Sequence, residues 1–255
     1  MERHWRAYHP DLPADAGTTI ELAPAESHHV QRVLRLRAGD TLLVFDGRGR
    51  EWSGAIEGGG PGGVTVRLEA EVDRAVEAPV EIVLFQGQCR SDRMEWVVQK
   101  ATELGVSAVH PVQAEQTDAR PPTPGRLARW RRIAIEACKQ SGRRCVPEIQ
   151  PLEGLPAPRP GTTAILLDGR AEGCPLGDLL AGSAPGRVWI AVGPESGFTV
   201  VEIAHWEEKG WQTASLGPRT LRTETAGLVA AAIVLHRWGD VGPVREQRGG
   251  VGQNG

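Results

Sequence analysis

The sequence predicts a small β domain followed by a larger α/β domain. The chain has 255 residues, which suits one large domain or two modest ones. Over about the first 75 residues, short apolar strands follow one another closely, as in a small barrel. From residue 79 onward strands alternate with helices, which favours a mostly parallel sheet. We therefore expect the β domain over 1–75, the α/β domain over 79–240 and a disordered tail over 241–255.

In the first domain the apolar residues have the period of two that β-strands show. Val64, Val66 and Leu68 alternate with polar residues, and an apolar run at 40–45 precedes the turn sequence at 46–49. The glycine-rich run at 58–63 is expected to break the chain. The expected elements are a helix at 25–36 and strands at 40–45, 51–56 and 64–68.

The second domain carries start and stop signals for several helices. Asp92 and Glu95 have the spacing of a capping box, as do Thr199 and Glu202, and Gly105 follows the first of these helices. The expected strands are at 80–85, 108–112, 163–168, 187–192 and 211–216. The expected helices are at 92–104, 124–142, 199–210 and 223–238.

The composition excludes several classes of protein. With 29 Lys and Arg against 32 Asp and Glu, the net charge of −3 excludes a uniformly basic nucleic-acid coat but allows a local basic patch. No run of about 18 apolar residues exists, so we expect no membrane span. The N-terminus lacks a signal-peptide core, which indicates the cytoplasm. The four cysteines have no zinc-site spacing, so we expect free thiols and no metal.

Glycine-bearing turns follow three apolar strands of the second domain. They contain Gly169, the run at 193–197, and Gly217. Ligands of open α/β sheets bind beyond the carboxyl ends of the strands, and glycine lets the backbone approach them closely. Ordinary strand-to-helix turns would look the same. Because the sequence has no P-loop, no dinucleotide fingerprint and no nucleophile elbow, a cofactor held by backbone amides is the remaining interpretation.

Three further stretches carry charged residues that suggest contacts with a ligand or with RNA. Arg222 stands just before the last helix and Glu224 lies in its first turn, so the two either pair or Arg222 holds a phosphate or an anionic base. Residues 120–144 contain eight basic residues and one acidic residue. His28, His29 and the arginines at 32, 35 and 37 form a second basic cluster. These clusters are either solvated faces or contacts to an RNA backbone.

Several motifs, in order along the chain, resemble one family. The strongest are Gly193-Pro194-Glu195-x-Gly197 and Leu216-Gly217-x-Arg219-x-Leu221-Arg222-x-Glu224-Thr225-Ala226. Segments at 6–10, 28–35, 45–47, 92–105 and 132–142 match as well. Over nearly its whole length the chain resembles the small-subunit ribosomal RNA uridine-N3 methyltransferases (the RsmE family) of the SPOUT superfamily.

The resemblance implies a fold and an activity that periodicity does not give. It implies an N-terminal PUA-like β-barrel that binds RNA, and a SPOUT-type α/β domain with a deep C-terminal trefoil knot. It also implies a homodimer that binds S-adenosyl-L-methionine and methylates N3 of a specific uridine in 16S rRNA of the small ribosomal subunit. Connection rules alone argue against a knot.

The resemblance also assigns roles to individual residues. The implied cofactor-binding residues are Leu167, Gly169, Val192, Gly193, Pro194, Glu195, Ser196, Gly197, Leu216, Gly217, Leu221, Arg222, Thr225 and Ala226. The implied RNA-binding residues are Arg6, His29, Arg32, Arg35, Arg131, Arg132 and Arg143. Arg222 and Glu224 are the implied catalytic residues. The family usually has glycine at the position of Ser196, so the geometry of that loop is open.

The expected chemistry starts from the acceptor atom. Uridine N3 carries a proton and lies in the Watson–Crick edge, so the base must be unpaired or flipped out. We expect Arg222 to stabilise the negative charge that develops on the base, and Glu224 or solvent to take the proton. Two alternatives stay open: another SPOUT activity such as ribose 2′-O methylation, and a non-catalytic RNA-binding or ribosome assembly protein.

Overall fold

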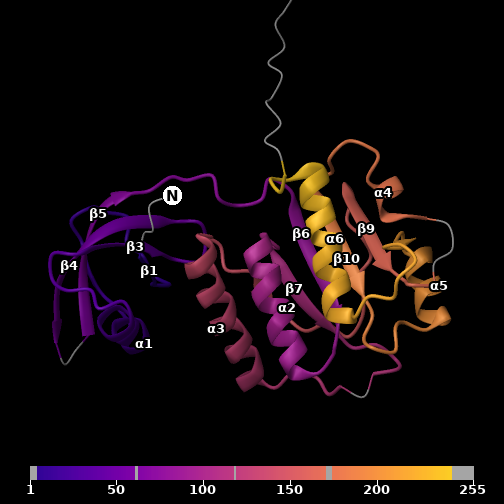
Figure 1. Ribbon diagram of the computed structural model, residues 1–255, viewed down its shortest axis with the longest axis horizontal. Coiled ribbons are helices and arrows are strands. Elements are labelled where there is room, and N and C mark those ends of the chain that lie inside the picture. The colour runs from indigo at the N-terminus through magenta and orange to yellow at the C-terminus, as the bar shows by residue number, and fades with distance from the viewer. Residues whose placement is uncertain (1–4, 61–62, 118, 171–173, 243–255) are drawn as a thin grey trace, which may run out of the picture.

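The structure is a computed structural model that describes residues 5–60, 63–117, 119–170 and 174–242. Two β-sheets form two bodies joined by an extended segment, with the smaller, N-terminal body on one side in Figure 1. The predicted disordered tail at 241–255 lies outside the described residues, apart from Val241 and Gly242.

The first body is built on a five-stranded sheet with the order β1-β3-β4-β5-β2. Val64, Val66 and Leu68 point into its core as the alternation predicts, together with Val44 and Trp52. Its strands are β1 (Arg6–Tyr8), β2 (Thr19–Glu21), β3 (Thr41–Phe45), β4 (Glu51–Gly60) and β5 (Gly63–Glu71).

Three expectations for this body need correction. Within the described residues no ladder joins the edge strands β1 and β2, so the sheet is not closed into the expected barrel. The glycine run at 58–63 does not break the strands, because β4 continues to Gly60 and β5 begins at Gly63. The single helix expected at 25–36 is a short α1 (Pro24–His28) followed by a π-helical turn, η1 (His29–Val33).

The second body is built on a six-stranded sheet in which every pair of neighbours is parallel, as predicted. The order is β11-β9-β10-β6-β7-β8. The strands are β6 (Glu81–Gly87), β7 (Ala108–Val112), β8 (Glu148–Ile149), β9 (Thr162–Leu167), β10 (Arg187–Val192) and β11 (Gln212–Ala214).

Helices cover both faces of this sheet, since alternate residues of each buried strand point to opposite sides. Ile82 and Leu84 of β6 pack on the face that α2, α3 and α6 cover, whereas Val83 and Phe85 pack toward α5. The helices are α2 (Ser91–Leu104), α3 (Pro124–Ser141), α4 (Leu176–Leu179), α5 (Val200–Glu208) and α6 (Thr223–Trp238).

The helix ends show which local signals decide the structure. The capping box of Thr199 and Glu202 is present, and Gly105 ends α2 in the left-handed conformation, as predicted. The capping box predicted for Asp92 and Glu95 is wrong. Helix α2 begins one residue earlier, at Ser91, and the carboxylate of Glu95 instead accepts a hydrogen bond of 2.8 Å from Arg129 on α3.

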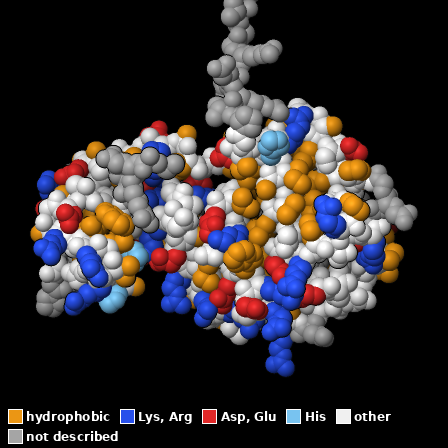
Figure 2. Space-filling model, viewed as in Figure 1, with side chains coloured by type: hydrophobic (Ala, Val, Ile, Leu, Met, Phe, Trp, Pro, Cys, Tyr) orange, Lys and Arg blue, Asp and Glu red, His pale blue; other side chains and the backbone are white. Residues whose placement is uncertain are grey.

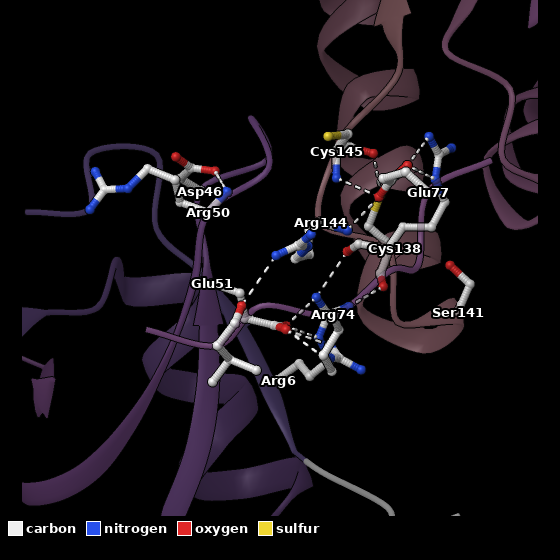
Figure 3. A network of polar contacts seen from close by, with 12 residues as sticks. Arg6, Asp46, Arg50, Glu51, Arg74, Glu77, Cys138, Ser141, Arg144 and Cys145 are labelled. Atoms are coloured by element: carbon white, nitrogen blue, oxygen red, sulfur yellow. Dashed lines mark hydrogen bonds and ion pairs between the residues drawn. The ribbon is translucent and has the colours of Figure 1, made fainter. Parts of the chain in front are cut away.

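Arg6, held by a buried ion pair within the first body, donates hydrogen bonds to the second body (Figure 3). Arg6 of β1 donates two hydrogen bonds to Oε1 of Glu51, and Arg74 pairs with the other carboxylate oxygen of Glu51. Arg6 also donates to the backbone carbonyls of Cys138 and Arg143, which belong to the second body. We call this set of contacts the junction. Breaking a buried ion pair by removing one partner costs about 3–5 kcal/mol, so Glu51 holds Arg6 firmly in the position from which it reaches the second body.

Candidate active site

A cavity lies at the carboxyl edge of the parallel sheet, with a volume of about 580 Å³. Three loops line it, namely those after β9, β10 and β11. They meet because Leu167, Val192 and Ala214, the last residues of these strands, are paired in register. The cavity therefore occupies the place where ligands of open α/β sheets bind.

The loop at 193–197 packs closely on itself and on the end of β6, and the close contacts leave no space for a side chain at Gly193 of the loop or at Gly87 of β6. A Cβ atom on Gly193 would lie 2.9 Å from the backbone of Gly197, and one on Gly87 would lie 2.3 Å from the nitrogen of Pro194. Gly197 has a φ of +75°, which few residues other than glycine adopt. These glycines therefore set the shape of the cavity wall.

Ser196, where the family usually has glycine, fits this loop without strain. Its φ is not positive, and its hydroxyl donates a hydrogen bond of 2.7 Å to the carbonyl of Gln116. The question that the sequence left open is thus answered, because the loop keeps an allowed backbone and gains one hydrogen bond.

The start of α6 is fastened to the sheet and to the glycine loop by one threonine. The buried hydroxyl of Thr223 accepts a hydrogen bond of 2.7 Å from Gln86 of β6 and donates to the carbonyl of Gly193. This chain of hydrogen bonds fixes where Arg222 and Glu224, the residues on either side of Thr223, enter the site. The sequence analysis missed Gln86 and Thr223; the signal for Gln86 is a polar residue inside the apolar strand β6.

Arg222 and Glu224 lie close together at this helix end, as expected. Arg222 is the N-cap residue of α6, and its Nη1 lies 3.9 Å from Oε1 of Glu224. Arg93 of α2, which the sequence analysis also missed, lies 3.8 Å from the same oxygen and 2.8 Å from the carboxylate of Glu195. Arg93 comes from a distant part of the chain, so only the fold reveals that it joins the site.

The structure gathers nearly all of the predicted cofactor-binding residues around the cavity. Thr225 is the exception: it lies, with Glu224, on a second groove next to the cavity. Further residues that line the cavity are Arg93, Asp168, Arg170, Phe198, Ile203, Ala214, Arg219, Thr220 and Thr223. Arg170 is held in place by hydrogen bonds to the carboxylate of Asp168 and the carbonyl of Phe198.

Two of the predicted RNA-binding residues are structural instead. Arg6 and Arg143 are buried, and their guanidinium groups donate to protein acceptors: Arg6 to Glu51 and two carbonyls, Arg143 to Glu77 and two carbonyls of the second body. A guanidinium enclosed in this way has no face left for a phosphate. The prediction that they contact RNA is corrected on this ground.

The other five predicted RNA-binding residues lie on the surface. Arg32 and Arg35 are exposed on and after η1, His29 is half-buried, and Arg131 and Arg132 are exposed on α3. Arg35 has a φ of +59°, unusual for a residue other than glycine. Figure 2 shows basic side chains on both bodies along the lower edge of that view.

No helix among the described residues is long and apolar enough to cross a membrane. Within the same part of the chain, no group of three or more His, Cys, Asp or Glu side chains could hold a metal ion.

Comparisons with known proteins agree with this site. Residues 76–235 match the family model described as an RNA methyltransferase domain, and residues 22–69 match the RNA methyltransferase PUA domain. Ribosomal RNA small subunit methyltransferase E of Synechocystis is 36% identical over 222 residues, covering 84% of this chain and 72% of that protein. The protein of the same name from Bacillus subtilis is 28% identical, covering 86% and 90%.

Solved structures give the same result. Ribosomal RNA small subunit methyltransferase E from Neisseria gonorrhoeae, crystallised with S-adenosyl methionine, aligns with a TM-score of 0.85 at 33% identity, covering 94% of this chain and all of that one. A putative methyltransferase from Legionella pneumophila, also with bound cofactor, aligns equally well at 32% identity and the same coverage. The chain is therefore a member of the ribosomal RNA small subunit methyltransferase E family, an RNA methyltransferase domain joined to a PUA domain.

Proposed function

We propose that this protein transfers a methyl group from S-adenosylmethionine to N3 of one uridine in the 16S rRNA of the small ribosomal subunit. The observation that carries the proposal is the cavity whose three glycine-bearing loops meet beside Arg222 and Glu224. The protein would act in the cytoplasm. Residues 1–75 would form the RNA-binding domain and residues 79–240 the methyltransferase domain.

The cavity has the size and chemistry that S-adenosylmethionine needs. Its volume of about 580 Å³ falls within the range of small-molecule sites, roughly 300–1,000 Å³. Leu167, Val192 and Leu216 offer apolar walls for the adenine ring. The loop at 193–197 offers backbone N–H and C=O groups for the polar edges of the ligand.

The residues at the start of α6 suit the chemistry of the acceptor. S-adenosylmethionine supplies an electrophilic methyl group, because its sulfur carries a positive charge. Uridine N3 becomes nucleophilic as its proton leaves, and the negative charge spreads to the two carbonyl oxygens of uracil. Arg222, whose side chain is 76% exposed, is free to reach that base and stabilise the charge. Glu224 is assigned as the proton acceptor.

RNA would cross both bodies of the protein. The exposed arginines Arg32 and Arg35 belong to the first body, and Arg131 and Arg132 belong to α3, which packs beside β1. Such arginines bind phosphates without reading sequence, so they would position the RNA while the cavity selects the base.

We extend the proposal to the trefoil knot and the homodimer of the SPOUT superfamily. Strand β11 pairs with the outer side of β9, yet α6 returns to pack on β10 and β6. The chain thus crosses back past the glycine loop, which supports a knot. Figure 2 displays hydrophobic side chains over α6 and the neighbouring α2. Leu228, Val229, Ala232 and Ile233 of α6 are only partly buried, which supports a second copy packing there.

The decisive experiment maps the methyl group. The protein is incubated with isotopically labelled S-adenosylmethionine and small subunits from a strain that lacks the enzyme, and the label is located by nuclease digestion and mass spectrometry. A single N3-methyluridine is the expected product. A label on a ribose would mean that the activity is 2′-O methylation. If the protein does not bind S-adenosylmethionine at all, the remaining interpretation is a non-catalytic RNA-binding protein.

The role of Arg222 has its own test. Arg222→Ala should lower turnover about 100- to 1,000-fold, by the roughly 2.7–4 kcal/mol typical of a lost charge-stabilising donor, while cofactor affinity changes little. Titration calorimetry with S-adenosylmethionine and single-turnover methylation separate the two effects. Arg159→Ala, an exposed arginine outside both cavities, is the matched control. Unchanged turnover in Arg222→Ala would remove this residue from the mechanism.

A further inference from the structure

A second groove opens beside the cofactor cavity and shares two arginines with it. Its volume is about 480 Å³, and it lies between the starts of α2 and α6. Arg93 and Arg222 line both spaces. We call it the base groove and define it by its lining residues, Arg90, Asp92, Arg93, Trp96, Arg222, Glu224 and Thr225.

Trp96 is an unusual residue to find in this groove. Its surface is 51% exposed, although Lys100 of the same helix places its ammonium 5.1 Å from the ring centroid. Folding gains little from a large aromatic side chain that stays in solvent. An exposed aromatic ring among arginines is the usual arrangement on which an unstacked nucleobase lies.

Glu224 carries an unmet hydrogen-bonding requirement. Its side chain is 13% exposed, and Oε1 lies 3.8 Å from Nε of Arg93 and 3.9 Å from Nη1 of Arg222. The other oxygen, Oε2, is buried and has no hydrogen-bond partner within the described part of the chain. A buried carboxylate oxygen without a donor is unfavourable, so a ligand that brings an N–H group would satisfy it.

We propose that the base groove holds the flipped uracil, with Trp96 stacked on the ring and Glu224 accepting the hydrogen bond of N3–H. The inference rests on the proposed function and adds Arg93 and Trp96 to the site. Arg93 and Arg222, which both approach Oε1 of Glu224, donate to the two carbonyl oxygens that flank N3. The groove then presents donor, acceptor and donor to an edge of acceptor, donor and acceptor.

This arrangement selects uracil over cytosine. Cytosine has a lone pair at N3 where uracil has a proton, so its N3 would face the carboxylate of Glu224 unfavourably. Its exocyclic amino group would also meet an arginine rather than an acceptor. Sites that must hydrogen-bond a specific group reject analogues that lack it. As the proton of N3 passes to Glu224, the electron pair left on N3 bonds to the methyl carbon, and the sulfur keeps the electron pair of the broken S–C bond.

Replacing the carboxylate of Glu224 by an amide tests the selectivity for uracil over cytosine. Wild-type protein and Glu224→Gln are compared on reconstituted small subunits that carry either uridine or cytidine at the mapped position. Because the amide can donate to cytosine N3, the cytidine-to-uridine ratio of kcat/KM should rise at least about fivefold. Glu208→Gln, an exposed residue at the end of α5, is the matched control. An unchanged ratio would overturn the assignment of Glu224.

The stacking role of Trp96 is tested separately. Trp96→Ala should raise the KM for small subunits roughly 5- to 100-fold, as expected for a lost base–aromatic stack, and Trp96→Phe should restore most of it. Affinity for S-adenosylmethionine should stay constant. Wild-type KM in Trp96→Ala would overturn the proposal. The proposal would also be overturned if Trp96→Ala sedimented as a smaller species than the wild-type oligomer, because Trp96 would then be an interface residue.

A readout independent of turnover completes the test. Small subunits with 5-iodouridine at the mapped position are irradiated in complex with the protein, and the cross-linked residue is identified by mass spectrometry. Cross-linking to Trp96 is expected, and cross-linking elsewhere contradicts the groove. If the wild-type protein methylates no uridine N3, the proposed function fails. If it does, and the groove variants behave like wild type, this inference alone fails.

Discussion

The junction and the base groove both rely on arginines, yet they treat them in opposite ways. At the junction, Arg6 lies buried against Glu51 and donates to two backbone carbonyls as well. In the base groove, Arg222 is mostly exposed, and its nearest carboxylate oxygen is 3.9 Å away. A saturated guanidinium holds the protein together, whereas an unsaturated one is available to a ligand.

This difference teaches why arginine-rich patterns in a sequence are ambiguous. Arg6 and Arg131 are both expected from the sequence to contact RNA, but Arg6 is buried and Arg131 is exposed. The deciding fact is whether another segment of the chain brings a carboxylate. The partner of Arg6 is 45 residues away in sequence, beyond the reach of any local pattern.

The largest expected effect comes from breaking the junction. Glu51→Ala should lower the free energy of unfolding by about 3–5 kcal/mol, since it leaves the buried Arg6 without its counter-charge. Urea denaturation followed by circular dichroism measures the change. As a control, Glu69→Ala removes a half-exposed partner of Arg67 and should cost about 1 kcal/mol or less. Equal losses in the two variants would mean that the junction is no stronger than a surface pair.

A second prediction separates surface arginines from junction arginines by their response to salt. Arg131→Ala and Arg132→Ala should each reduce the slope of log K against log salt for subunit binding by about 1, with unfolding unchanged. Arg6→Lys should do the reverse, lowering stability while the slope stays constant. Filter binding over a range of salt concentrations tests this. A reduced slope of log K against log salt in Arg6→Lys would mean that Arg6 does contact RNA, contrary to its assignment as a structural residue.

The smallest effect concerns two buried thiols, one near each region. Burial raises the pKa of Cys138 at the junction and of Cys89 near the groove from 9.0 to about 12. Between these values the unfolded chain releases protons that the folded chain retains, so stability falls as the pH rises from about 9 toward 12. Cys138→Ala should flatten this fall in urea denaturation at pH 8 to 10. An equally steep fall in the variant would contradict the burial effect.

The order and type of most elements could be predicted from the sequence, because each carries its own local signal. Strand β10 is a continuous apolar run, and α5 is bounded by the Thr199 capping box. The failures arose where tertiary contacts override local preference. Glu95 accepts a hydrogen bond from Arg129 instead of capping its own helix. The glycines at 58–60 form strand pairs with β5, although glycine disfavours strands.

The candidate site likewise contains residues that the sequence could predict and residues that it could not. The glycine loops could be predicted, because glycine after a strand marks a place where the backbone approaches something closely. Arg93, Gln86 and Thr223 could not, since their contribution depends on α2, β6 and α6 meeting in space. Thr225 follows Glu224 in the motif yet turns away from the cofactor cavity, because successive helical residues face different directions.

Gly87 has a consequence for how the family tolerates change. It bears no functional group, and a Cβ atom at this position would lie only 2.3 Å from the nitrogen of Pro194. One added methyl group there would push the 193–197 loop out of place. An inactivating mutation in this enzyme therefore need not remove any group that touches a substrate. A survey of variants scored by chemistry alone would overlook position 87, although the structure leaves no space there for a side chain.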